Sequence, residues 1–212
     1  MRTAIVVGGG IGGLGAAIGL RRRGWDVTVL ERQEEVTPAG AGLVLQANGM
    51  RCLDVLGLGD TVRAGGRPAS GGGPRTPDGR WLARIDGDIM ADLLGTSAVG
   101  IHRASLHRIL LDAVPPGTVR TGAAVTGVTV DGTVTCGPDT LRADLVVGAD
   151  GINSAVRAAL WPEHPGPARA GVVAWRGVTR DPWPRDVEVA ITWGRGEEFG
   201  VVPLLDGRIY WF

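Results

Sequence analysis

The feature that most constrains this chain is a glycine-rich turn between a short strand and a helix near the N-terminus. Thr3–Val7 is apolar and rich in β-branched residues, which is typical of a buried strand. Gly8, Gly10 and Gly13 follow at the spacing G-x-G-x-x-G, and a helix of small residues is predicted from there to Arg23. A strand, a turn of this spacing and a helix in this order indicate a dinucleotide-binding βαβ unit.

Each position of this turn has a physical role. Gly8 lets the chain turn sharply off the strand, Gly10 lets the backbone approach a pyrophosphate, and Gly13 lets the helix pack closely on the sheet. Ile11 and Gly12 lie at the start of the helix, where unpaired N–H groups and a partial positive charge favour phosphate. We therefore expect Gly8, Gly10, Ile11, Gly12 and Gly13 to contact the cofactor.

An acidic residue at the end of the second strand strengthens this interpretation. Asp26–Leu30 (DVTVL) is predicted as a strand, and Glu31 follows it directly, 18 positions after Gly13. A carboxylate there can accept hydrogen bonds from a ribose diol and would repel a 2′-phosphate, which favours FAD or NAD over NADP. The alternative is a glycine-rich turn without a ligand, in a chain that has 36 glycines.

Composition excludes several classes of function. The 212 residues suffice for one large or two small domains, and 44% of them are hydrophobic, enough for a real core. Lys+Arg and Asp+Glu each number 22, with no long block of like charge, which argues against a nucleic-acid or anionic-membrane partner. Every basic residue is an arginine, so no mechanism can use a catalytic lysine.

The cysteine, histidine and hydropathy patterns argue against further classes of site, namely metal sites and membrane spans. Cys52 and Cys136 are isolated, which suits free thiols in a reducing compartment. His102, His107 and His164 form no ligand cluster, so no metal site is predicted. No apolar run reaches the roughly 18 residues of a membrane span, and a cytoplasmic location is expected.

The remainder of the chain is predicted to alternate between a nucleotide-binding part and a second sheet. A polar connection is expected as far as Pro38. Helices are expected at 47–56, 105–114 and 154–160; a loop or hairpin tip at 65–79; strands near 80–85 and at 100–103 and 144–148; and a hairpin turn at Asp131-Gly132. Further strands are expected at 170–178, 187–193, 198–203 and 207–212, with no helix between them, so they form an antiparallel sheet.

Three stretches together carry a family resemblance: residues 8–13 (GGGIGG) with Glu31-Arg32, residues 102–106 (HRASL) and residues 144–157 (DLVVGADGINSAVR). They resemble the single-component FAD-dependent aromatic hydroxylases, typified by p-hydroxybenzoate hydroxylase, and more closely the branch of salicylate hydroxylase and zeaxanthin epoxidase. Residues 40–42 with Asn48, and residues 174–177 (AWRG), look like that branch too. The resemblance extends over essentially the whole chain.

The resemblance implies an α/β fold, a FAD-binding Rossmann-like domain (doubly wound, mainly parallel sheet) with a second, antiparallel substrate-domain sheet. We expect residues 1–66 and 98–168 to form the FAD-binding domain and residues 67–97 and 169–212 part of the substrate-binding domain. Under this resemblance Gly8, Gly10 and Gly13 hold the FAD pyrophosphate, Glu31 the adenosine ribose, and Arg32 lies beside the adenosine.

The resemblance also assigns roles later in the chain. Arg103 contacts the chain that links the two halves of FAD, and Asp150-Gly151 lies near the pyrophosphate and the nicotinamide donor. Arg103 could instead cap a helix or pair on the surface. Asp150 could be only the N-cap of the following helix, although the cap and cofactor roles can coexist. Arg157 is interpreted as structural, tying the turn to that helix.

Two residues are candidates for the substrate pocket. Gln46 lies where the family brings residues near the isoalloxazine, and the alternative is a plain polar residue of an edge strand. Arg176 could bind a substrate carboxylate, but a salt bridge at the sheet edge is the favoured interpretation. Because Trp175 and Arg176 are expected to alternate across a strand, only one of them can face a pocket.

The implied activity is hydroxylation of a small aromatic or olefinic substrate, with NAD(P)H as electron donor and O2 added to the flavin as a C4a-hydroperoxide. Three alternatives remain open. A flavin-dependent halogenase needs a lysine and a W-x-W-x-I-P stretch, and neither is present. An NAD-dependent dehydrogenase explains residues 8–31 but not 144–157. A non-catalytic or truncated flavin-fold fragment is the third.

The third alternative rests on a missing motif. Family members carry a G-D-A-A-H-like segment after the substrate sheet, whereas Gly-Asp occurs here only at Gly59-Asp60 and Gly87-Asp88, without Ala-Ala-His. The chain also stops at Phe212, within an apolar strand. We therefore expect the N-terminal part of a longer enzyme or a truncated gene product. Alone, it is expected to bind FAD weakly, not to hydroxylate, and to associate with further copies of itself through the unfinished sheet.

Overall fold

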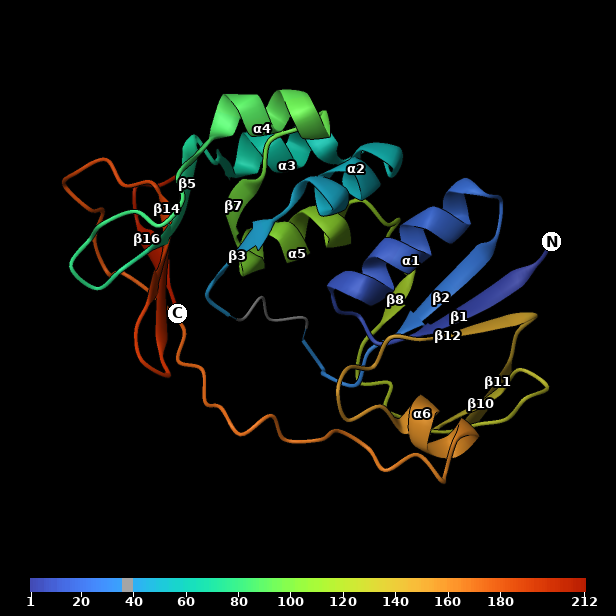
Figure 1. Cartoon of the computed structure of the whole chain (residues 1–212). Helices are drawn as coiled ribbons and strands as arrows, with labels where there is room; N and C mark the ends of the chain where they lie inside the picture. Colours follow the sequence, from blue (N-terminus) through green and yellow to red (C-terminus); the bar gives the residue numbers. More distant parts are fainter. Residues whose placement is uncertain (36–39) are drawn as a thin grey trace. The chain divides into compact units, whose positions relative to one another are not determined.

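The computed structural model describes residues 1–35 and 40–212 (Figure 1). By its internal contacts the chain forms two compact units, residues 1–37 with 110–172 and residues 38–109 with 173–212. The end of the predicted connection at Pro38 lies outside the described residues. The division into a FAD-binding part and a substrate-binding part is a functional assignment, and it stays a prediction.

The first unit is built on a parallel sheet in the order β12-β1-β2-β8. Its strands are β1 (Thr3–Val7), β2 (Asp26–Leu30), β8 (Val119–Arg120) and β12 (Leu145–Gly148). Helix α1 (Ile11–Arg22) covers one face of this sheet (Figure 1). The other face carries α6 (Ala155–Leu160) and an antiparallel sheet of β9 (Val125–Val128), β10 (Thr133–Cys136) and β11 (Asp139–Arg142).

Strand β1 is the centre of this unit. Val6 pairs in register with Val29 on one side and with Val147 on the other, and its side chain is fully buried. Ile5 and Val7 point to the opposite face and join a buried cluster that includes residues of β10 and α6. Burial on both faces explains why this strand is a continuous apolar run rather than an alternating one.

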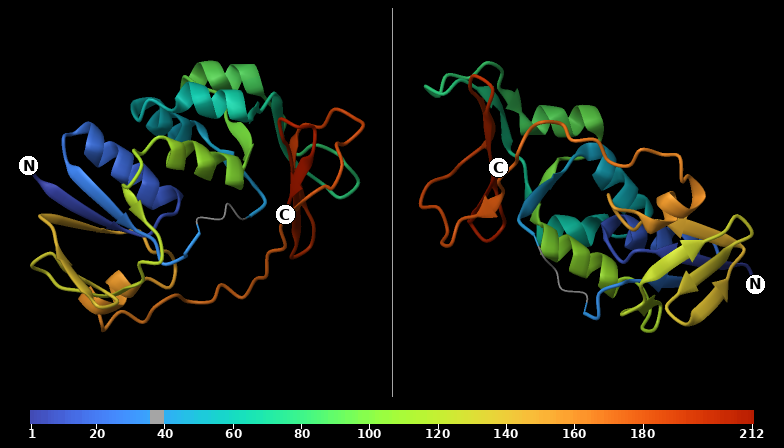
Figure 2. Two further views of the ribbon diagram at one scale, coloured as in Figure 1. Left: turned by 180° about the vertical axis from the view of Figure 1, so that it is seen from behind. Right: turned by 90° about the horizontal axis from the view of Figure 1, so that it is seen from below.

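The second unit contains a mixed sheet in the order β13-β16-β15-β14-β5-β6. Its strands are β5 (Gly71–Arg75), β6 (Ile85–Asp86), β13 (Gly177–Val178), β14 (Val189–Trp193), β15 (Glu198–Pro203) and β16 (Ile209–Trp211). Neighbours are antiparallel except for β14 and β5, which are parallel. Figure 2 shows the three C-terminal strands, in red, beside β5 from much earlier in the chain.

A smaller antiparallel sheet and several helices complete the second unit. The sheet has the order β3-β7-β4, formed by β3 (Gly42–Leu45), β4 (Arg67–Pro68) and β7 (Val99–His102). The helices are α2 (Ala47–Val55), α3 (Gly59–Gly65), α4 (Gly87–Leu94) and α5 (Arg103–Asp112), of which α5 runs on past the boundary of the unit. Val202, Leu204 and Tyr210 form a buried cluster against β3.

The α/β class, with a parallel sheet and separate antiparallel sheets, confirms the predicted fold class. The hairpin at Asp131-Gly132 is also confirmed, because β9 and β10 pair on either side of it. Three local predictions were wrong. The loop predicted at 65–79 contains β4 and β5, and the strand predicted at 80–85 is only a bridge from Trp81 to Arg75 before β6 begins. Helices α3 and α4 were not predicted.

The third error is the strand predicted at 170–178. Only Gly177 and Val178 form a strand there, and the segment before them has no regular structure. Val172, Val173 and Trp175 are 80%, 82% and 77% exposed, so the apolar pattern does not correspond to a buried face. A strand exists only where a partner strand lies alongside, and that pairing is not a property of the local sequence.

Gly72 shows why a triple-glycine stretch can be a strand here. Its φ is +135°, and an added Cβ would lie 1.8 Å from the carbonyl oxygen of Val189 on the neighbouring strand β14. Glycine at this position therefore permits a close approach of two backbones that no other residue allows.

We expect Gly72→Ala to destabilise the protein by more than Gly79→Ala. Both glycines have positive φ, so each substitution carries a backbone cost of roughly 1–2 kcal/mol. At Gly79, however, an added Cβ meets nothing within 4 Å. Urea unfolding of both variants measures the difference, which reports the β5–β14 contact. Equal midpoints for the two variants would contradict this packing.

Candidate functional site

The turn between β1 and α1 has the geometry that the glycine spacing predicts. Gly8 has φ +107°, and its N–H donates to the carbonyl oxygen of Leu30 over 2.8 Å. An added Cβ on Gly13 would lie 1.9 Å from the carbonyl oxygen of Gly8, so the helix backbone rests directly on the turn. An added Cβ on Gly10 meets nothing within 4 Å, so this position faces open space.

The start of α1 is suited to an anion. Gly10 is the N-cap and has no side chain to bond the first N–H groups, and the first turn holds no acidic residue. The first turn includes Ile11, Gly12 and Gly13, and Gly12 also has nothing within 4 Å of an added Cβ. Exposed N–H groups at a helix N-terminus, with small residues around them, form a favourable site for a phosphate group.

Glu31 lies against this turn. Its Oε2 accepts a hydrogen bond from the N–H of Gly9 over 2.7 Å, and its Oε1 accepts one from the N–H of Gln33 over 2.9 Å. An ionised carboxylate has about four acceptor positions, so it can also accept from ribose hydroxyl groups. The two backbone bonds fix the carboxylate beside the turn. Arg32, the next residue, is exposed.

The end of β12 adjoins the same turn. Ala149 donates from its N–H to the carbonyl oxygen of Val7 over 2.8 Å, and an added Cβ on Gly8 would lie 2.4 Å from the carbonyl oxygen of Ala149. Asp150 and Gly151 come next, and Gly151 has φ +83°. The carboxyl ends of two neighbouring parallel strands thus meet here, which is where open α/β sheets bind ligands.

Asp150 acts as a cap of α6. Its Oδ1 accepts from the hydroxyl of Ser154 over 2.6 Å, and its Oδ2 accepts from the N–H groups of Ala155 and Val156 over 2.6 and 3.2 Å. This is the cap role that the sequence left as an alternative. Arg157 donates to the carbonyl oxygen of Ile152 over 2.5 Å, which confirms its structural role. Asp150 and Gly151 also line a pocket of about 540 Å³ between β12 and α6.

In the second unit, Arg103 is exposed and is the first residue of α5, which therefore begins two residues before the predicted position 105. Its N–H donates to the carbonyl oxygen of Ala41 over 3.0 Å. An added Cβ on Gly40 would lie 3.0 Å from Cδ of Arg103, and Gly40 has φ +120°. The arginine stem therefore packs against a backbone position that only glycine tolerates.

The two candidates for the substrate pocket lie in different settings. Gln46 is the N-cap of α2, makes no side-chain cap bond, and lines a pocket of about 190 Å³ formed by α4, β3, β5, β6 and β14. We call this the α4 pocket. Arg176 is exposed, precedes β13 and lines neither pocket. The expected alternation of Trp175 and Arg176 across a strand is wrong, because no strand is present.

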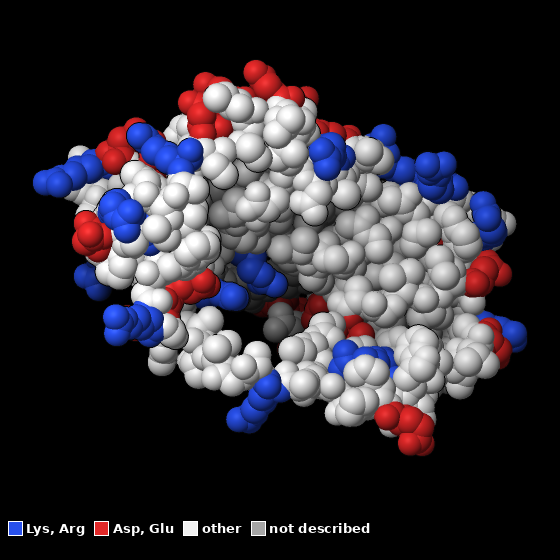
Figure 3. Space-filling view, viewed as in Figure 1, with Lys and Arg blue, Asp and Glu red and all other residues white. Residues whose placement is uncertain are grey.

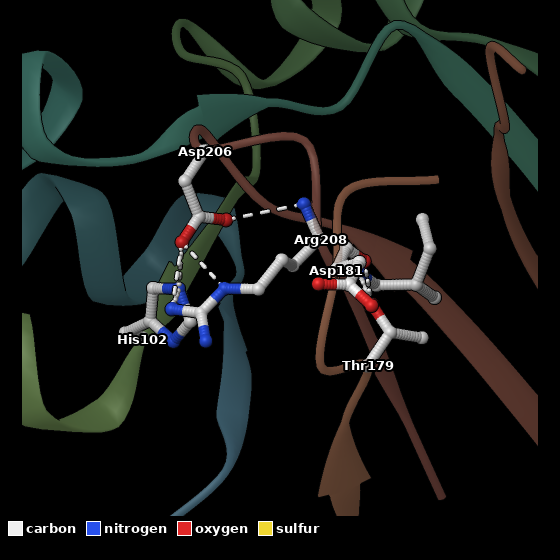
Figure 4. Close-up of polar contacts among 6 residues, drawn as sticks. His102, Thr179, Asp181, Asp206 and Arg208 are labelled. Carbon is white, nitrogen blue, oxygen red and sulfur yellow. Dashed lines mark hydrogen bonds and ion pairs between the residues drawn. The ribbon is translucent and has the colours of Figure 1, made fainter. Parts of the chain in front are cut away.

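A cluster of His102, Asp206 and Arg208 was missed from the sequence (Figure 4). Nε2 of His102 lies 2.9 Å from Oδ2 of Asp206, and Nε of Arg208 donates to the same oxygen over 2.8 Å. The cluster joins the turn after β15 to the end of β7, immediately before Arg103. Its partners are 104 residues apart, and no spacing in the sequence signals the contact.

The charges of this cluster shift the titration of Asp206. Partial burial raises the pKa of its carboxyl group, but hydrogen bonds from Arg208 and His102 outweigh it and lower the pKa from 3.8 to about 2. Elsewhere on the face shown in Figure 3, acidic and basic side chains are interspersed with uncharged surface, as the even charge balance predicts.

Within residues 1–35 and 40–212, no group of three or more His, Cys, Asp or Glu side chains is placed to hold a metal ion. Over the same ranges, no helix combines the length and the apolar character that crossing a membrane requires.

Comparison with known proteins decides the family. Residues 1–211 match the model of the FAD binding domain family. The chain belongs to this family. The glycine turn of this chain has an open Gly10, a helix N-terminus without acids and the fixed carboxylate of Glu31, which together suit a dinucleotide.

Individual relatives are monooxygenases and related enzymes of aromatic compounds. The chain is 36% identical over 227 residues to the aurachin C monooxygenase/isomerase of Stigmatella aurantiaca, with 99% of this chain and 56% of that protein covered. It is 40% identical over 160 residues to the 2-heptyl-3-hydroxy-4(1H)-quinolone synthase of Mycobacteroides abscessus, with 73% and 41% covered. The chain therefore spans about half the length of the curated relatives it matches.

A solved structure supports the same assignment. The structure of Klebsiella pneumoniae HpxO in complex with FAD and uric acid has a TM-score of 0.88 and 29% sequence identity, and the match covers 99% of this chain and 55% of that one. The predicted resemblance to FAD-dependent aromatic hydroxylases is confirmed at the level of the family. The roles of the individual site residues stay predictions.

We expect Gly10→Val to abolish FAD binding while leaving the fold intact. A side chain there would occupy the space predicted for the pyrophosphate, and an added Cβ has no other part of the described protein within 4 Å beyond its chain neighbours. Gly15→Val is the matched control, because Gly15 lies on α1 and also has open space around an added Cβ. Flavin titration and thermal unfolding measure both effects. Unchanged FAD affinity in Gly10→Val would mean that residues 8–13 are only a structural turn and do not bind the cofactor.

The pKa of Asp206 gives a second expectation. Because its folded pKa of about 2 is below the usual 3.8, its contribution to stability is present above pH 3.8 and is lost as the pH falls towards about 2. Asp206→Asn should cost about 1 kcal/mol at neutral pH, after allowance for solvent screening of a partly exposed group. The cost should vanish in strong acid. Urea unfolding across this range tests it, with the exposed Asp92→Asn as control.

Proposed function

We propose that this chain supplies the FAD-binding part and a portion of the substrate-binding part of a monooxygenase that hydroxylates a small aromatic compound. The observation that carries the proposal is the β1–α1 turn of a chain in the FAD binding domain family. Gly10 faces open space, the N–H groups of α1 are uncapped, and Glu31 is held beside them. These are the features that a dinucleotide needs.

Each predicted residue takes a role in binding. The backbone of Gly8, Gly10 and Gly13 and the first turn of α1 hold the pyrophosphate, and the carboxylate of Glu31 accepts from the adenosine ribose. Arg32 lies beside the adenosine. These assignments are supported by the geometry of the turn and by the family.

The later residues complete the cofactor site. Arg103 contacts the chain that links the two halves of FAD. Asp150 and Gly151, at the turn after β12, lie near the pyrophosphate and the nicotinamide donor. Asp150 keeps its hydrogen bonds to α6 in this role. We retain the division of the chain into a FAD-binding part, residues 1–66 and 98–168, and a partial substrate-binding part, residues 67–97 and 169–212.

When bound, the flavin supplies the transfer of electrons from NADH or NADPH to O2 and of one oxygen atom to the substrate. The protein binds and orients the reactants and excludes water. The groups that this chain is proposed to offer the cofactor are backbone N–H groups, carboxylates and arginines. The Glu31 position is assigned to the adenosine ribose of FAD, so it does not select between NADH and NADPH as the electron donor.

Two kinds of aromatic substrate are candidates. One solved relative holds uric acid, a small polar ring system, and one curated relative is named for a quinolone with a heptyl chain. The substrate of this chain is proposed to be a small aromatic compound of one of these kinds. Association between copies of the chain through its sheet is retained as part of the proposal.

Titration of the purified chain with FAD, followed by the change in flavin fluorescence, tests the proposal. FAD should bind and NAD should compete only weakly. Glu31→Ala should weaken FAD binding by roughly 1–3 kcal/mol, because ribose hydroxyl groups lose their acceptor. Tight binding of NAD with none of FAD would overturn the cofactor assignment.

Turnover is a separate measurement on the same preparation. Substrate-stimulated oxidation of NADH or NADPH, with hydroxylated product, would establish the monooxygenase activity for this chain. Binding of FAD without any such turnover would mean that the chain alone is a flavin-binding portion that lacks catalysis.

A further inference from the structure

The α4 pocket has a lining without charged side chains. Its polar side chains are those of Gln46, Thr96 and Ser97. The remaining lining residues are small or apolar: Val44, Ala47, Ala69, Gly71, Gly72, Ile85, Gly87, Met90, Ala91, Leu94, Ala98 and Val189. A carboxylate in this pocket would meet no cationic side chain of the lining to offset its loss of hydration.

The arginines of the surrounding elements are already engaged. Arg67 on β4 pairs with Asp186 over 2.6 Å, and Arg84 before β6 pairs with Glu188 over 2.5 Å. Neither arginine lines the pocket. Two further arginines bond lining residues: Arg63 donates to Oγ1 of Thr96 over 3.2 Å, and Arg51 donates to the carbonyl oxygen of Leu94 over 2.9 Å. Neither of them is part of the lining itself.

The pocket is a built feature of the second unit. Asp86 caps α4 by accepting from the N–H groups of Asp88 and Ile89 over 2.9 and 3.2 Å, and Gly95 ends the helix in the left-handed region. Arg51 of α2 donates to the carbonyl oxygen of Leu94 over 2.9 Å. These bonds hold α4 over the sheet from both of its ends.

Small residues keep the interior open. An added Cβ on Gly87 would lie 2.4 Å from the carbonyl oxygen of Ala69, and one on Gly72 would lie 1.8 Å from the carbonyl oxygen of Val189 on β14. Backbone and alanine side chains thus form much of the wall. Ile89 and Leu93, on the other side of α4, are 68% and 75% exposed and do not line the pocket.

We propose that the α4 pocket receives an apolar substituent of a neutral aromatic substrate, so that the enzyme prefers ring compounds with an alkyl chain over carboxylate-bearing or highly polar ones. This inference rests on the proposed function. Gln46 supplies an amide at the pocket, where the family resemblance expects the isoalloxazine. The aromatic ring then lies at Gln46, and the alkyl chain lies among Met90, Ala91 and Leu94.

A ligand series tests this preference directly. Calorimetric titrations would use 4(1H)-quinolone without a side chain and with methyl, propyl, pentyl and heptyl groups at position 2, and salicylate as the anionic compound. Affinity should rise about fourfold for each methylene until the pocket is filled. Salicylate should bind more weakly than every alkylquinolone. An affinity independent of chain length, or tighter binding of salicylate, would overturn the proposal.

Three variants locate the effect. Ala91→Phe fills the pocket and should abolish the gain from the alkyl chain, while the unsubstituted quinolone binds as before. Leu93→Phe, on the exposed side of the same helix, is the matched control and should leave the series unchanged. Met90→Arg places a cation in the lining and should raise the affinity for salicylate at least tenfold. If affinity still rises with alkyl length in Ala91→Phe, the alkyl group binds elsewhere and the inference is refuted.

The titrations are made with and without FAD, and FAD binding is measured by the visible spectrum. Absence of FAD binding would contradict the proposed function, whereas the alkyl series without FAD still tests the pocket. FAD binding together with a flat alkyl series would keep the proposed function and refute the apolar preference.

Discussion

The contact between the start of α1 and the end of β1 is the constraint on which the first unit depends. The backbone at Gly13 lies so close to the carbonyl oxygen of Gly8 that any side chain would collide with it. This contact places the helix N-terminus directly over the ends of β1 and β12. Because it leaves Gly10 facing open space, the same close packing that fixes the helix also creates the turn at which we propose that the cofactor binds.

Capping and binding share residues in this unit. Glu31 and Asp150 are both acidic residues at strand ends, and both accept backbone hydrogen bonds. Glu31 accepts from the turn between β1 and α1, where the cofactor is proposed to bind. Asp150 accepts from the first residues of α6, the helix that follows Asp150 in the chain. The difference lies in which N–H groups are nearby, not in residue type. A carboxylate that already holds a loop in place is also preorganised to accept from a ligand.

The second unit differs from the first, because its main feature is a pocket rather than an open turn at a helix N-terminus. Glycine and alanine bring β5, β14 and α4 together without filling the space between them. The cluster of His102, Asp206 and Arg208 ties the turn of the same sheet to the residue before Arg103. Within this unit, the strand that leads to a predicted flavin contact is thereby fixed to the sheet that carries the pocket.

The sequence by itself determined the local features of the site. Glycine spacing, strand pattern and Glu31 act over a few residues, so the β1–α1 turn followed from them. Only the tertiary structure decided the rest. β5 is a strand because β14 lies beside it, residues 170–176 are not a strand because no partner does, and Asp206 meets His102 across 104 residues. Pairing and charge contacts over such distances depend on the whole fold, which local residue patterns do not encode.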